Sequence, residues 1–212
     1  MIGRAMSAII SNPLTAPTRA WDRLVALWIS QNHNIEVVGK LILNGRPLID
    51  IRKESKLYIG DRVTLNSRNR GYHVNMHSPV KLFADKPGAV IRIGDNTRIH
   101  GTCIHAHESI EIGNNCLIAA NCQIFDGNGH DTSFPDIENR IHTSGESMPI
   151  RIEDNVWIGV NSIILPGVTI GKGSIISANS VVNKYIPPMV IAGGNPAKVL
   201  SEHHMGHRLK SG

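Results

Sequence analysis

The chain of 212 residues has few aromatic side chains, three cysteines and no long apolar run. Aromatic residues make up 4% of the sequence, which is too few for a broad core and favours a narrow one of aliphatic and small residues. The cysteines are not spaced as metal ligands, and we find no signal peptide. These absences argue against a secreted, disulfide-stabilised protein and predict a cytoplasmic location.

Positive charge is in excess but is not concentrated anywhere. The formal net charge is +5, from 22 lysines and arginines against 17 acidic residues. The basic residues are scattered and aromatic residues that would stack on bases are scarce, so we expect no nucleic-acid partner. The surplus is compatible with an anionic membrane surface or a phosphorylated small molecule.

A six-residue repeat between 152 and 187 is the strongest pattern in the sequence. Aliphatic residues recur every six positions, at Ile152, Ile158, Ile164, Ile170, Ile176 and Val182. This period fits neither the 3.6-residue turn of a helix nor the two-residue alternation of a half-buried strand. Three short strands per turn satisfy it, so the sequence predicts an all-β fold, a parallel β-helix of hexapeptide repeats.

The same phase is present upstream, with one irregularity. It runs from Ile93 to Ile124 and slips by one residue between Cys103 and Ile112. Gly, Asn and Asp follow the aliphatic positions and tolerate the positive φ of tight corners. All three cysteines are predicted to occupy small inward positions of the repeat, which they would fill as compact apolar groups.

The region before the repeats has a helical pattern of apolar residues. Helical spacing of Trp21, Leu24, Val25 and Trp28 predicts a short helix between Ala16 and Ser30. We expect it to cover the open end of the β-helix; the alternative is docking on a membrane surface, the inner membrane face in particular.

We predict three segments along the chain. Residues 1 to 56 are expected to form the capping helix and an irregular lead-in, residues 57 to 200 the β-helix, and residues 201 to 212 a tail. The arginine-rich stretch 66 to 73 is expected to line a substrate site. The repeat stops after His130, so residues 131 to 149 are predicted to leave the prism as an extended loop, where solenoid proteins often build their sites.

Several stretches together resemble a known family. The chain resembles the hexapeptide-repeat acyltransferases in three stretches. These are IEIGNNCLIAANCQIFDGNGHD, the loop after it, and Gly-Asn-Pro-Ala-Lys at 194 to 198. The resemblance is strongest to the sugar O-acetyltransferase branch, which includes the maltose, galactoside, colanic-acid and O-antigen acetyltransferases. It implies a left-handed coil, acetyl-CoA as cosubstrate, no metal ion, and a homotrimer with active sites between subunits.

The resemblance also implies roles for individual residues. His130 matches the catalytic base, which takes the proton of a sugar hydroxyl as that hydroxyl attacks the thioester. His100 and Asp126 match positions near the acceptor. The positions expected to contact acetyl-CoA are Gly159, Val160, Ala178, Asn183, Lys184 and Lys198.

Other functions stay open at this point. An amino sugar is an alternative acceptor, although residues 1 to 60 show no glycine-rich nucleotide-binding turn. A zinc enzyme similar to the γ-carbonic anhydrases is suggested by the spacing of His100 and His105. A noncatalytic β-helix scaffold is the third alternative. We favour O-acetylation of a sugar or glycan in polysaccharide, O-antigen or capsule biosynthesis.

Overall fold

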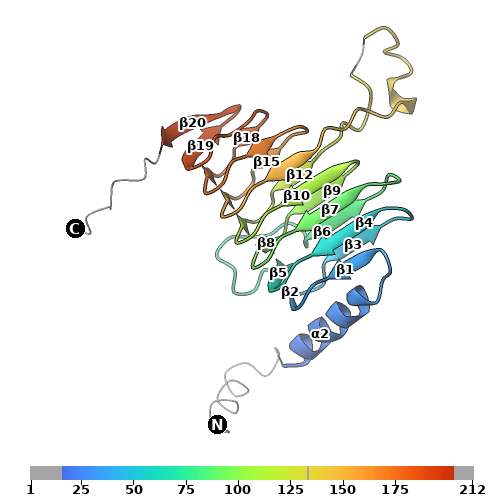
Figure 1. The fold of residues 1–212 in the computed structure, drawn as a ribbon, viewed down its shortest axis with the longest axis vertical. Coiled ribbons are helices and arrows are strands. Elements are labelled where there is room, and N and C mark those ends of the chain that lie inside the picture. Colours follow the sequence, from blue (N-terminus) through green and yellow to red (C-terminus); the bar gives the residue numbers. More distant parts are fainter. Residues whose placement is uncertain (1–15, 133, 203–212) are drawn as a thin grey trace, which may run out of the picture.

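The protein is a stack of triangular coils, as the computed structural model shows for residues 16 to 132 and 134 to 202 (Figure 1). For residues 16 to 19 and 30 the structure describes the backbone alone. Three sheets form the sides of the prism, and each coil up to β18 contributes one strand to each sheet. The strands pair in parallel except for the final pair, β19 with β20, which is antiparallel. The predicted parallel β-helix is therefore confirmed.

We name the three sheets A, B and C. Sheet A consists of β1 (Ile35–Val37), β4 (Lys56–Ile59), β7 (Val90–Ile93), β10 (Ser109–Ile112), β13 (Ile150–Ile152) and β16 (Thr169–Ile170). Sheet B consists of β2 (Leu41–Asn44), β5 (Val63–Asn66), β8 (Arg98–His100), β11 (Leu117–Ile118), β14 (Trp157–Ile158), β17 (Ile175–Ile176), β19 (Val190–Gly194) and β20 (Ala197–Glu202). Sheet C consists of β3 (Leu48–Ile51), β6 (Lys81–Ala84), β9 (Cys103–Ala106), β12 (Gln123–Phe125), β15 (Ile163–Ile164) and β18 (Val181–Val182).

Ladders of aliphatic side chains fill the prism. Ile118 pairs with Ile99 and Ile158 on neighbouring coils, and all three side chains are fully buried. The corners are formed by asparagines with positive φ, at Asn96, Asn115, Asn121, Asn155, Asn161 and Asn179. Asparagine tolerates this left-handed conformation better than most residues, so the sequence pattern correctly located the corners.

The β-helix begins earlier than the sequence predicted. β1, β2 and β3 form a complete first coil that pairs in parallel with β4, β5 and β6, so residues 35 to 56 are not an irregular lead-in. The six-residue phase is in fact present there, at Val37, Leu43 and Ile49, and the corners between these strands turn through Gly39 and Gly45, both with positive φ. At the other end, β20 continues to Glu202, and residues 203 to 212 of the predicted tail lie outside the described residues.

The cysteines do not all face inward. Cys116 and Cys122 are buried, and burial raises the pKa of the Cys122 thiol to about 11. Cys103 is only partly buried, because it pairs with Lys81 and Gln123 on the outer face of sheet C. The inward position before Ile104 is instead occupied by the buried Thr102. The slip in the repeat therefore starts at this strand.

The predicted helix is present and caps the first coil, but the face that it buries is not the one that the sequence suggested. Helix α2 (Ala16–Ser30) packs on β1 and β2. Its buried face carries Ile29 and also Asp22, which forms an ion pair with Arg68 at 3.2 Å. Trp21 and Trp28 are exposed, so they do not contribute to the core as their spacing suggested. In the described residues, no helix is long and apolar enough to span a membrane.

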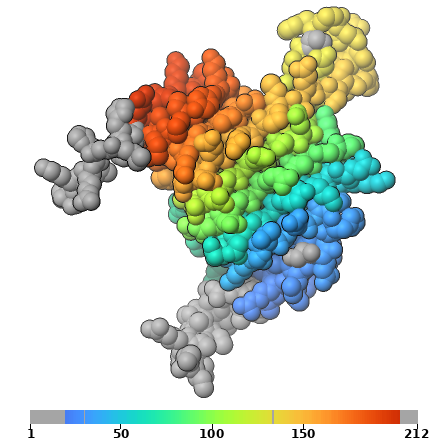
Figure 2. Space-filling view, in the orientation of Figure 1, coloured from blue at the N-terminus to red at the C-terminus, as the bar shows by residue number. Residues whose placement is uncertain are grey.

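The predicted loop is also present. The chain leaves the prism after β12 and returns at β13, with a short 3-10 helix, η1 (Arg140–His142), between them. Figure 2 shows this segment standing away from the coils as a separate projection. Its base is held by a Gly127–Ser147 bridge and by the bond from the Asn128 amide to the Glu146 carbonyl (3.0 Å).

Candidate active site

A groove of about 700 Å³ runs along the outer face of sheet B. Four of the residues singled out from the sequence line it together: His100, Gly159, Val160 and Ala178. The remaining lining residues are Tyr72, His73, Val74, Arg98, Leu117, Ile118, Ala119, Trp157, Ile175, Ile176 and Ser177. The fold thus brings the expected acceptor residue and part of the expected cofactor surface into one depression.

The floor of the groove is flat because of Gly159. A Cβ atom at this position would lie 2.6 Å from the Ala178 backbone nitrogen, so no larger residue fits without moving the next coil. The Gly159 amide donates to the carbonyl of Ile176 at 2.8 Å and the Asn179 amide donates to the carbonyl of Val160 at 2.9 Å. Two coils are thereby held close together, which leaves room for a narrow chain to lie along them.

His100 is held by a stacked ring and an oriented amide. Its ring stacks on Tyr72 with centroids 4.6 Å apart and an interplanar angle of 19°. The Asn66 oxygen accepts from the Arg68 amide (3.2 Å), so its NH₂ group faces His100 Nδ1 at 3.2 Å. Nδ1 is therefore the acceptor and Nε2 carries the proton in the neutral ring.

The environment of His100 disfavours its charged form. Burial, together with the positive charges of Arg98 and His73, lowers the pKa of His100 to about 4. The ring is neutral at pH 7 and is a weak base, so it is suited to donating a hydrogen bond from Nε2 and not to removing a proton.

The second wall of the groove comes from a segment that the repeat pattern did not describe. Residues 67 to 80 connect β5 to β6, and this insertion places Tyr72, His73 and Val74 over the groove. The sequence had indicated the stretch 66 to 73 only through its basic residues. A clearer signal is the gap between Leu65 and Leu82, two buried core residues separated by far more than six positions.

His130 does not line this groove. It is exposed at the base of the protruding loop, next to Asp131, whose amide donates to Thr143 Oγ1 at 2.9 Å. The loop leaves from sheet C and returns to sheet A, whereas the groove lies on sheet B. Within one chain, the expected base and the expected cofactor surface are therefore on different sides of the prism.

The side chain of Asp126 is buried, and its carboxylate is occupied by hydrogen bonds to the backbone. Its side chain has no exposed surface, and its carboxylate accepts three backbone hydrogen bonds, from His107 (2.6 Å), Glu108 (2.9 Å) and Ser109 (2.6 Å). This geometry does not fit the substrate-binding role expected for Asp126. The carboxylate instead fastens the corner after β9 to the base of the loop.

The other three residues expected to contact acetyl-CoA are exposed and lie outside the groove lining. Asn183 and Lys184 follow β18 in sheet C. Lys198 lies on β20 opposite Gly193, at the end of sheet B that extends beyond the groove. Both lysines are free of ion pairs within the described part of the chain.

The two histidines that suggested a zinc enzyme are not neighbours. His100 is in β8 of sheet B, whereas His105 is in β9 of sheet C, where its Nε2 lies 3.1 Å from Asp85 Oδ1. The five-residue spacing spans a corner of the prism, so the pair cannot bind one ion in this chain.

Comparisons with known proteins agree with this architecture. The family described as "Hexapeptide repeat of succinyl-transferase" matches residues 90–125 and 149–184. The chain is 38% identical over 165 residues to a provisionally named acetyltransferase of Saccharomyces cerevisiae, covering 72% of this chain and 82% of that protein. It is 34% identical to WbbJ of Escherichia coli K12, provisionally named as a lipopolysaccharide biosynthesis O-acetyl transferase, covering 68% and 77%.

A solved structure extends the likeness over most of the chain. Galactoside acetyltransferase in complex with coenzyme A superposes with a TM-score of 0.55 at 26% identity, covering 91% of this chain and 88% of that one. The protein belongs to the hexapeptide-repeat acetyltransferase family and has its left-handed β-helix.

Proposed function

We propose that this protein transfers the acetyl group of acetyl-CoA to a sugar hydroxyl during the synthesis of a polysaccharide such as an O-antigen or capsule. The observation that carries the proposal is the shared groove of His100, Gly159, Val160 and Ala178. Its flat, backbone-lined floor suits the narrow pantetheine arm. The similar galactoside acetyltransferase is in complex with coenzyme A, and WbbJ is provisionally named as a lipopolysaccharide biosynthesis O-acetyl transferase.

In this proposal His130 is the general base. Its imidazole removes the proton from the acceptor hydroxyl as the oxygen attacks the thioester carbonyl carbon, and the carbon–sulfur bond then breaks. The proton passes from the imidazolium to the departing thiolate, which gives an acetyl ester and coenzyme A. No enzyme nucleophile is required. His100 donates a hydrogen bond from Nε2 to an oxygen of the bound acceptor.

The complete site requires a second subunit. The loop with His130 and the groove are on different sides of one chain. Trp157, 49% exposed, lines the groove with Leu117, and the exposed Ile191 lies in the same register column of sheet B. We propose a homotrimer in which each groove is closed by the 131 to 149 loop of a neighbour. Lys184 and Lys198 then remain available for the nucleotide phosphates.

Removal of His130 tests the assignment of the base. Thiol release from acetyl-CoA, measured against a panel of sugars and nucleotide sugars, should fall by about 10²–10⁴-fold in His130→Ala. His142→Ala is the matched control, because His142 is an exposed histidine on the same loop. Unchanged thiol release in His130→Ala would refute the mechanism, and silence of the parent protein toward every sugar would favour a scaffold.

The outer face of α2 supports a further part of the proposal, peripheral contact with an anionic membrane. Trp21, Leu24 and Trp28 are exposed together on this face, and Arg23 is exposed beside them. Indole and aliphatic groups flanked by arginine suit the interface of an anionic bilayer. Co-sedimentation with vesicles containing phosphatidylglycerol should be lost in Trp21→Ser/Trp28→Ser; equal sedimentation of the variant would exclude this contact.

A further inference from the structure

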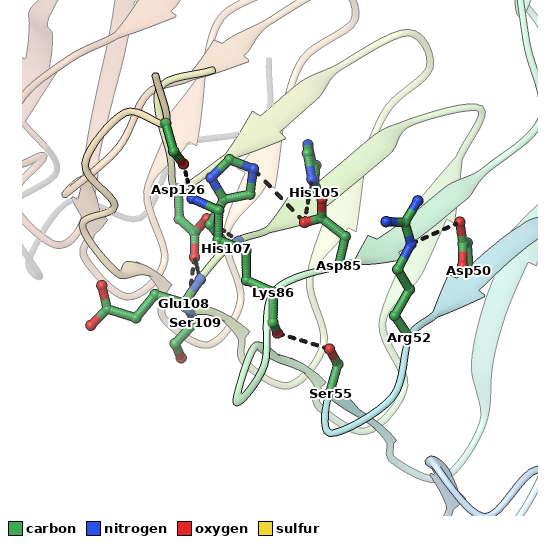
Figure 3. A network of polar contacts seen from close by, with 11 residues as sticks. Asp50, Arg52, Ser55, Asp85, Lys86, His105, His107, Glu108, Ser109 and Asp126 are labelled. Atoms are coloured by element: carbon green, nitrogen blue, oxygen red, sulfur yellow. Dashed lines mark hydrogen bonds and ion pairs between the residues drawn. The ribbon is translucent and has the colours of Figure 1, made fainter. Parts of the chain in front are cut away.

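Three side chains with metal-binding atoms meet at a corner between sheets C and A, apart from the groove. Asp85 directly follows β6, His105 lies on β9, and His107 directly follows β9 (Figure 3). The stacking register explains the meeting, because Phe83 pairs with His105 and Ala84 pairs with Ala106. Asp85 and His107 consequently emerge at the same corner of successive coils.

The separations of the three groups match those of ligands around one ion. His105 Nε2 lies 3.1 Å from Asp85 Oδ1, and His107 Nε2 lies 3.8 Å from the same oxygen. The ligand atoms of all three residues lie within 4.8 Å of one another. A tetrahedral Zn²⁺ with bonds of about 2.0–2.2 Å separates its donors by about 3.2–3.6 Å, so small side-chain rotations would complete the site.

The imidazole ring of His107 is buried and lacks hydrogen-bond partners in the described part of the chain. Its side chain is only 9% exposed, and its Nδ1 is buried with no hydrogen-bond partner. Nδ1 packs against Gly127, where any Cβ atom would collide with it. Nε2 is too far from Asp85 for a hydrogen bond, so neither ring nitrogen makes one within the described residues. An ion beside Asp85 would supply the partner that Nε2 lacks, whereas Nδ1 would stay against Gly127.

Both imidazole rings are already fixed. The His105 ring stacks on Phe83, with centroids 4.4 Å apart and an interplanar angle of 20°. The His107 ring meets His105 edge-on at 4.5 Å, and its backbone amide donates to Asp126 at 2.6 Å. Fixed rings lose little conformational freedom on binding an ion, which favours affinity.

We propose that Asp85, His105 and His107 bind a divalent transition-metal ion, with Zn²⁺ the best match to two imidazoles and one carboxylate. The fourth position is left for water. The site is separate from the groove and takes no part in acyl transfer. Because the backbone after His107 is bonded to Asp126, where the protruding loop begins, the bound ion stabilises the base of that loop.

Equilibrium dialysis and calorimetry with ZnCl₂ test the proposal, on protein without an affinity tag and stripped with a chelator. We expect one ion per chain with a Kd of about 1 μM or tighter at pH 7.5. Asp85→Asn and His107→Gln should each weaken binding at least about tenfold, by analogy with losses seen at metal sites. Co²⁺ in place of Zn²⁺ should give visible absorption bands that both variants lose.

Two controls separate this site from other histidines. His142→Ala removes an exposed histidine from the neighbouring loop. A second control replaces His203, His204 and His207 with alanine, because these residues of the C-terminal segment are potential ligands by composition. Circular dichroism and size-exclusion chromatography establish that each variant folds. The proposal is overturned by substoichiometric binding, by unchanged affinity in folded Asp85→Asn and His107→Gln, or by loss of binding in a control.

Discussion

Mixing two inactive variants will restore activity if the active site is shared between subunits. His130→Ala lacks the proposed base but keeps an intact groove. Ala178→Trp keeps His130 but fills the groove, and because Ala178 is exposed, the indole enters the groove and not the core. Each variant alone has no complete site. An interface that joins the loop of Ala178→Trp to the groove of His130→Ala has both parts.

The expected gain follows from the geometry. The loop and the groove lie on different sides of one prism, so in the proposed trimer each interface draws its loop from one subunit and its groove from the next. With equal amounts and random assembly, half of the loops and half of the grooves are intact. The productive combination then occurs at about a quarter of all interfaces. In every trimer that contains both variants it occurs at one interface of the three, so the captured mixed oligomers should reach about a third of the parent activity.

The assay is thiol release by protein purified from cells that express both variants with different tags. Sequential capture on both tags selects mixed oligomers, and Ala178→Ser is the control that leaves the groove open. Recovery no greater than the summed activities of the separate variants would refute the shared site. The base and the groove would then have to act within a single chain, which the arrangement of the sheets opposes.

Two further predictions concern stability. Because folded His100 has a pKa of about 4 against 6.5 for an ordinary histidine, the unfolded chain binds more protons between these values, and stability should fall as the pH drops through this window. Urea midpoints should fall less steeply in His100→Asn, and identical slopes would contradict the lowered pKa. Asp126→Asn keeps one acceptor oxygen and loses the two hydrogen bonds that Oδ2 accepts from Glu108 and Ser109. Hydrogen bonds to a charged acceptor contribute about 1.5–3 kcal/mol each, so the free energy of unfolding should fall by at least about 3 kcal/mol. Asp136→Asn, at an exposed loop position, is the matched control, and an equal, small loss in both variants would show that the Asp126 contacts are unimportant.

The sequence alone predicted the β-helix and the position of the protruding loop. The spacing of residues such as Ile158 and Ile176 predicted three strands per coil, and the stop at His130 located the loop. The resemblance placed Gly159 and Ala178 together, and they line one groove because positions one coil apart share a face. A repeat of constant length encodes stacking directly, because each residue lies over its equivalent in the preceding coil.

Only the tertiary structure decided which side chains meet where the coils differ in length. Cys103 turned outward because the corner between β8 and β9 is one residue short of the six-residue phase, and the same corner separates His105 from His100. The Asp126 carboxylate is buried because it binds the backbone of the irregular corner after β9. The wall of the groove at Tyr72 and the cluster at Asp85 depend on coil insertions in the same way. Periodicity determines which residues fill the core, whereas the contacts at an irregular corner depend on the path of the backbone through it, and that path is fixed by long-range packing and hydrogen bonds.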